Sequence, residues 1–117
     1  MSFDVELVHA ETEAIAILPV SHDDGGTIVK GGSNEAYLNI TYNYSQLFKI
    51  ALHPEGLRHL NRKTARDVIL PLSIAVEKLG IDTDPDYWKA TPGNAGHALN
   101  ILLRWARWFP DHVFIVT

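Results

Sequence analysis

A long amphipathic helix is the feature that most constrains the fold of this chain. Between Thr64 and Gly80 the apolar residues recur at spacings of three and four, as one face of a helix requires. Asp67 stands in the expected first turn, and a glycine commonly follows the last turn of a helix. We therefore predict a helix over residues 64–80, whose inward face consists of Ala65, Val68, Ile69, Leu72, Ala75, Val76 and Leu79.

A second long helix is predicted to begin at Thr91. Thr91 can cap this helix, and Pro92 suits its first position. The backbone amides expected to point outward at this start, where an anion could bind, are those of Gly93, Asn94 and Ala95. Ordinary capping is the alternative interpretation. The predicted inward residues are Ala95, Ala98, Leu99, Leu102, Trp105, Ala106 and Phe109, opposite a stripe of His97, Asn100, Arg104 and Arg107.

The first part of the chain has the alternation of a β-strand. Apolar and polar side chains alternate from Phe3 to Leu7, and a second short apolar run over residues 14–20, after a polar turn, predicts a second strand antiparallel to the first. Residues 21–34 are rich in turn-forming residues, and residues 113–116 could form an edge strand or an extended tail. We therefore predict a single α+β domain over residues 1–117, with a small N-terminal antiparallel sheet packed against a C-terminal helical layer.

Composition limits the classes of function. The chain has 117 residues, a net charge of -4 and no cysteine, which excludes disulfides, thiolate metal sites and cysteine nucleophiles. Before Tyr44 there are seven acids against Lys30 alone, whereas nine bases face seven acids from there onward. We therefore expect any anion site in the second part and no general nucleic-acid binding. No signal-peptide pattern and no membrane-length apolar run is present, so we predict a cytoplasmic protein without membrane contact.

A dense row of polar groups occupies residues 39–45, where a strand is expected to pass into a helix. On a continuing strand, alternate residues would project one row of hydrogen-bonding side chains, suited to a sugar or nucleobase edge. That row is Asn39, Thr41, Asn43 and Ser45, with Ile40, Tyr42 and Tyr44 on the other face. In the alternative interpretation, Asn43 and Ser45 cap a helix and Thr41 bonds within the sheet.

The most basic stretch runs from Arg58 to Arg66. An arginine here could bind phosphate or carboxylate in a bidentate manner, although such a stretch is more often a solvated face. The six histidines are scattered, and no pair has the His-x-x-x-His spacing, so we predict no metal site. No nucleophile motif or paired catalytic carboxylates are present, which leaves an enzyme as the less favoured class.

Several motifs together resemble a family of small uncharacterised proteins of phages and prophage-bearing bacteria. They are Gly31-Gly32-Ser33-Asn34-Glu35-Ala36-Tyr37-Leu38-Asn39-Ile40-Thr41-Tyr42-Asn43-Tyr44-Ser45, Gly56-Leu57-Arg58, Lys63-Thr64-Ala65 and Asp86-Tyr87-Trp88-Lys89-Ala90-Thr91-Pro92-Gly93-Asn94-Ala95. The resemblance covers roughly the last three quarters of the chain and departs at Gly96-His97, where a longer basic side chain is expected. It implies no catalytic residue and no cofactor.

Together these patterns predict a non-catalytic binder of a small anionic, nucleotide-like ligand. In a phage setting, such a protein could sequester a bacterial immune signal nucleotide. The alternative is a protein-interaction or oligomeric module whose surface includes Trp88, Trp105 and Trp108. The predicted ligand-binding residues are Asn39, Thr41, Tyr42, Asn43, Tyr44, Ser45, Arg58, Thr91, Gly93 and Asn94.

Overall fold

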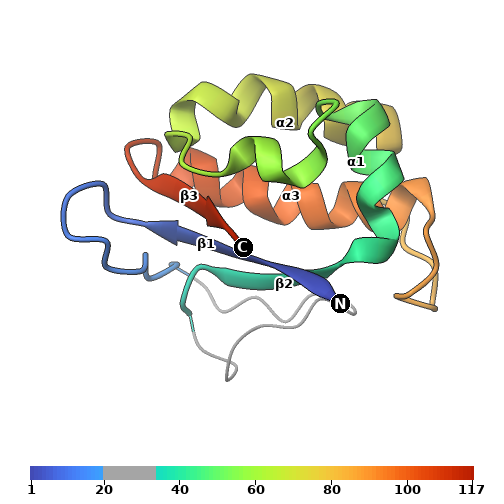
Figure 1. Ribbon diagram of the computed structural model, residues 1–117, viewed down its shortest axis with the longest axis horizontal. Helices are drawn as coiled ribbons and strands as arrows, with labels where there is room; N and C mark the ends of the chain where they lie inside the picture. Colours follow the sequence, from blue (N-terminus) through green and yellow to red (C-terminus); the bar gives the residue numbers. More distant parts are fainter. Residues whose placement is uncertain (20–33) are drawn as a thin grey trace.

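A computed structural model of the chain describes residues 1–19 and 34–117 (Figure 1). The turn-rich segment predicted over residues 21–34 lies outside the described residues, apart from Asn34. The elements, in chain order, are β1 (Ser2–Val8), β2 (Tyr37–Thr41), the 3₁₀ helix η2 (Tyr42–Tyr44), α1 (Ser45–Ala51), the 3₁₀ helix η3 (Gly56–Leu60), α2 (Ala65–Leu79), α3 (Pro92–Trp108) and β3 (Val113–Val116). The α+β class is confirmed.

The sheet has three antiparallel strands in the order β2-β1-β3, so the first strand is central. Phe3 pairs with Ile40, and Leu7 pairs with Phe114 on the other side. Alternation of apolar and polar residues places one face of the sheet in the core. The buried side chains of that face are Phe3, Val5, Leu7, Leu38, Ile40, Phe114 and Val116. The C-terminal run is therefore an edge strand rather than an extended tail.

The predicted strand over residues 14–20 is wrong in the part that the structure describes. Ile15 makes a single bridge to Val8, and Ile17 makes another to Glu35. Glu13, just before this run, has a positive φ of 61°, which turns the chain sharply. Because the run divides its backbone bonds between two neighbours, no continuous ladder forms.

Helix α3 runs between the sheet and α2 in the view of Figure 1, and both helices contribute side chains to the core. The predicted helix over residues 64–80 is confirmed, as is the start of α3 at Thr91. The predicted polar stripe of α3 does lie opposite the buried residues, but of its four members only Arg107 is fully exposed. Ile101 and Leu103 are buried as well, and Arg104 is only partly exposed, because α3 is covered on more than one side. No helix in the described ranges has the length and apolarity needed to cross a bilayer.

Candidate functional site

The predicted polar row does not lie along one strand face. Strand β2 ends at Thr41, and the chain turns at once into η2 and then α1. Thr41 is buried, and its Oγ1 accepts a hydrogen bond of 3.2 Å from the backbone amide of Asn43. The Ser45 hydroxyl donates to the carbonyl oxygen of Tyr42 at 2.7 Å. Thr41 is therefore the cap of η2, and the expectation that Asn43 caps the helix is wrong.

Asn39 lies on the outer, polar face of the sheet, where its partners are other strand residues. Its side-chain amide donates to Ser2 Oγ at 2.6 Å and to Asp4 Oδ1 at 3.0 Å. The Tyr37 hydroxyl donates to the same carboxylate oxygen at 2.5 Å, and this hydrogen bond to Asp4 raises the pKa of Tyr37. Asn39 thus belongs to a cross-strand network.

Asn43 and Tyr44 bind the loop between α2 and α3. The Asn43 side-chain amide donates to the carbonyl oxygen of Trp88 at 2.8 Å. The hydroxyl of the fully buried Tyr44 donates to the carbonyl oxygen of Tyr87. The backbone amide of Thr41 adds a bond of 3.0 Å to the hydroxyl of Tyr87. These predicted ligand residues therefore hold residues 87–88 against the end of β2.

The start of α3 is closed by the same loop. Asn94 is 5% exposed, and its side chain accepts from the Asp84 amide at 2.8 Å and donates to the Lys89 carbonyl at 2.9 Å. Its backbone amide donates to Thr91 Oγ1 at 3.1 Å. A Cβ added to Gly93 would lie 1.7 Å from the carbonyl oxygen of Asp82. The expectation of outward, free amides is wrong here, because the preceding loop covers the helix start and ordinary capping applies.

Three of the predicted residues, Tyr42, Ser45 and Arg58, do meet at a cavity of about 330 Å³. The cavity lies where β1, η2, α1 and η3 come together. Its remaining lining residues, none of which was predicted, are Phe3, Lys49, Glu55, Gly56 and Leu57. Thr91, Gly93 and Asn94 do not line it, so the structure does not bring the helix start to Arg58.

Arg58 is held in place on the aromatic wall of this cavity. Its Nη2 donates to the Tyr42 hydroxyl at 3.2 Å, and its guanidinium carbon lies 5.3 Å from the centre of the Phe3 ring. Phe3 and Tyr42 pack edge to face with ring centres 4.6 Å apart. The guanidinium of this exposed arginine is thus oriented by one hydrogen bond and one cation–π contact.

The cavity has more positive than negative side chains. Lys49 and Arg58 face one carboxylate, that of Glu55. Within residues 1–19 and 34–117, neither cation has an acidic partner within 4.0 Å. Gly56 adopts a positive φ of 68°, and a Cβ there would lie 3.3 Å from Lys49 Cγ. A glycine therefore allows the turn that sets η3 against α1.

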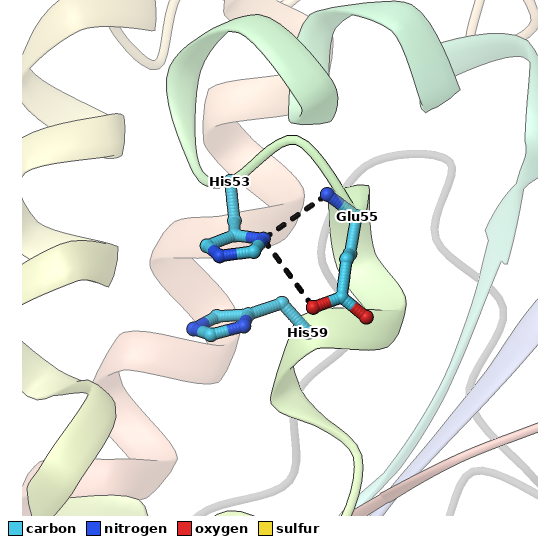
Figure 2. A group of neighbouring side chains, drawn as sticks. All are labelled: His53, Glu55 and His59. Atoms are coloured by element: carbon cyan, nitrogen blue, oxygen red, sulfur yellow. Dashed lines mark hydrogen bonds and ion pairs between the residues drawn. The ribbon is translucent and has the colours of Figure 1, made fainter.

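A second group that the sequence interpretation missed lies beside the cavity: His53, Glu55 and His59 (Figure 2). The two imidazole rings stack with their centres 3.7 Å apart and their planes 6° apart. Burial, with His53 and Lys63 nearby, lowers the pKa of His59, which favours the neutral ring that binds metals. The His-x-x-x-His spacing indicates two histidines on one face of a single helix. These three residues come instead from the end of α1 and from η3, so that spacing does not detect them.

Comparisons with known protein families, curated proteins and solved structures identify no relative of this chain. No family model, curated protein or solved structure matches the chain. The resemblance to phage proteins therefore stays a prediction.

Proposed function

We propose that this protein binds a small anionic ligand in the cavity between Tyr42 and Arg58, without catalysing a reaction on it. The observation that carries the proposal is the position of the Arg58 guanidinium. It is held by the Tyr42 hydroxyl and the Phe3 ring, and it has no acidic partner among the described residues. A guanidinium that is oriented in this way and is not neutralised is suited to bidentate binding of a phosphate or carboxylate.

The rest of the lining restricts the class of ligand. Lys49 supplies a second cation, while Phe3 and Tyr42 supply an apolar wall for a planar group. The volume of about 330 Å³ is near the lower end of the range for ligand pockets, about 300–1,000 Å³. A mononucleotide or smaller phosphate ester fits these features better than a long polyanion. Sequestration of an immune signal nucleotide is a narrower form of the proposal and is supported only by the resemblance.

The polar groups of the lining support binding rather than catalysis. Nucleophilic catalysis needs a hydroxyl or thiol next to a base that takes its proton. The Ser45 hydroxyl instead donates to the backbone carbonyl of Tyr42. Among the described lining residues, no nucleophile is hydrogen-bonded to a side-chain base.

Isothermal titration with inorganic phosphate and with a panel of mononucleotides tests the proposal. Arg58→Lys keeps the charge but loses the bidentate fork, so affinity should fall about tenfold. Arg58→Glu should weaken binding by about a hundredfold or more. Arg107→Glu is the matched control, because Arg107 is exposed on α3 and does not line the cavity.

Equal affinity of the wild-type protein and Arg58→Glu for every ligand bound would contradict the proposal. Thermal melting of each variant must show that it is folded.

The alternative function is a protein-interaction module with three tryptophans at its surface. Trp105 is only 1% exposed and cannot belong to such a surface, whereas Trp88 is 58% and Trp108 is 40% exposed. An adaptor of that kind need not gain stability from any small anion, whereas the proposed binder must.

A further inference from the structure

We infer that His53, Glu55 and His59 form a binding site for a divalent transition-metal ion, with zinc as the ion that best suits the ligand set. Two imidazoles and one carboxylate are a common protein ligand set for zinc, and water can occupy the fourth position. The inference does not depend on anion binding, although Glu55 belongs to both groups.

The backbone brings the three residues together over a short span. His53 follows α1, and its amide still donates to the carbonyl of Phe48 at 3.2 Å. Glu55 precedes η3, and His59 lies within it. Figure 2 shows the two stacked rings with the Glu55 carboxylate at one side of them. The change from α1 to η3 thus places three side chains, two to six positions apart in the sequence, around one point.

The distances require only a small contraction to bind an ion. One possible ligand atom of each residue lies within 4.8 Å of the other two, and Glu55 Oε1 is 3.8 Å from His53 Nδ1. Around tetrahedral zinc, with bonds of about 2.1 Å, ligand atoms are about 3.4 Å apart. The stacked rings must also tilt, because their lone pairs lie in the ring planes. Side-chain exposures of 35% for His53 and 71% for Glu55 leave room for these movements.

The hydrogen bonding of His53 is compatible with this role. Its Nδ1 accepts a bond of 3.0 Å from the backbone amide of Glu55, so the electron pair of this nitrogen points toward Glu55. An ion bound at Nδ1 would replace that hydrogen bond, and the freed amide could bond to water because Glu55 is exposed. Since Glu55 also lines the cavity, a bound cation would add positive charge next to Arg58.

Titration with zinc chloride in a phosphate-free, non-coordinating buffer tests the site. The wild-type protein should bind one ion per chain. His53→Ala, His59→Ala and Glu55→Gln should each weaken binding about tenfold or more, since even indirect partners of a metal site have effects of that size. His9→Ala is the matched control. His9 is an exposed histidine whose ring lies 5.5 Å from that of His112, and that pair is the other histidine pair in contact among the described residues.

The outcomes separate this inference from the proposed function. Absence of saturable zinc binding would overturn it, as would a loss of affinity in His9→Ala equal to that in His59→Ala. Arg58→Glu should retain zinc binding, because Arg58 is not a ligand of the ion. Phosphate titration in the presence of a chelator then tests the anion cavity alone, so either proposal can fail without the other.

Discussion

The phenol hydroxyl of Tyr44 donates a hydrogen bond to the backbone carbonyl of Tyr87, 43 positions further along the chain. The two rings also pack edge to face with their centres 5.6 Å apart. The Tyr87 hydroxyl returns to the end of β2, where it accepts from the Thr41 amide and donates to the Asn39 carbonyl at 3.4 Å. The polar and aromatic motifs around residues 39–45 and 86–95 therefore bind each other.

Removal of the Tyr44 hydroxyl should change how stability depends on pH. Burial, with Tyr87 and Asp86 nearby, raises the pKa of Tyr44 well above its ordinary value of 10.0. The folded state thus keeps a proton that the unfolded state loses, so this stabilisation is complete below about pH 10 and is lost as the pH rises further. In urea unfolding at about pH 8 and about pH 11, Tyr44→Phe should lose less stability between the two conditions than the wild type. Equal losses would contradict the burial of this hydroxyl.

Asn94 should matter more for folding than Asn43. The buried side chain of Asn94 makes three hydrogen bonds to the backbone of residues 84–89. Asn94→Ala removes all three of these bonds at once and frees the loop from the start of α3, and we expect the free energy of unfolding to fall by about 2–4 kcal/mol. The single bond of the exposed Asn43 suggests a loss of about 1 kcal/mol or less in Asn43→Ala. Chemical denaturation measures both, and the reverse order would contradict the assignment of Asn94 as the residue that holds the loop.

The sequence predicted those parts of the fold that depend on local periodicity. The spacing of apolar residues in α2 and the alternation from Phe3 to Leu7 each determine a buried face, whatever packs against it. The site could not be predicted in the same way, because asparagine, threonine and serine form caps, turns and ligand contacts with the same groups. Which of these roles Asn94 has depends on the loop at residues 84–89.

The contacts of two predicted site residues, Arg58 and Gly93, could not be predicted from the sequence either. Arg58 was predicted from its charge, but its contacts with Phe3 and Tyr42 depend on how η3 lies against β1 and η2. The backbone at Gly93, predicted to bind an anion, is closely approached by another group, but that group is the chain's own carbonyl at Asp82. A pattern in the sequence can show that a position needs a glycine without showing which partner requires it.

Added side chains at Gly93 or Gly96 should destabilise the protein strongly. A Cβ at Gly93 would lie 1.7 Å from the Asp82 carbonyl oxygen, and one at Gly96 would lie 1.7 Å from that of Gly80. Both obstacles are backbone atoms, so Gly93→Ala and Gly96→Ala should each cost about 3 kcal/mol or more, despite the better helix propensity of alanine. Arg107→Ala, at an exposed position of the same helix, should change stability by about 0.5 kcal/mol or less. Near-normal melting of Gly96→Ala would show that α3 does not pack so closely on residue 80.

The two tryptophans near the end of α3 should differ in their contribution to stability. Trp105 is 1% exposed within the core, whereas Trp108, three residues later, is 40% exposed. Trp105→Ala should cost about 3–5 kcal/mol, because it leaves a large cavity among buried side chains. Trp108→Ala should cost about 1 kcal/mol. Chemical denaturation that ranks the two variants in the opposite order would mean that α3 presents a different face to the core.

Gly56 connects the two proposed sites, and its substitution should affect both. Its φ of 68° is unfavourable for most side chains, and a Cβ there would meet Lys49 Cγ at 3.3 Å. We expect Gly56→Ala to lose about 1–2 kcal/mol of stability and to shift η3, which carries Arg58 and His59. Its affinities for phosphate and for zinc should then fall together.

Gly56→Asn is the matched control for that prediction. Asparagine adopts positive φ more readily than alanine, so this variant should be less destabilised and should keep more of both affinities. Arg58→Lys should reduce phosphate affinity alone, and His59→Ala should reduce zinc affinity alone. Wild-type affinities for both ions in Gly56→Ala would show that neither site depends on the turn that sets η3 against α1.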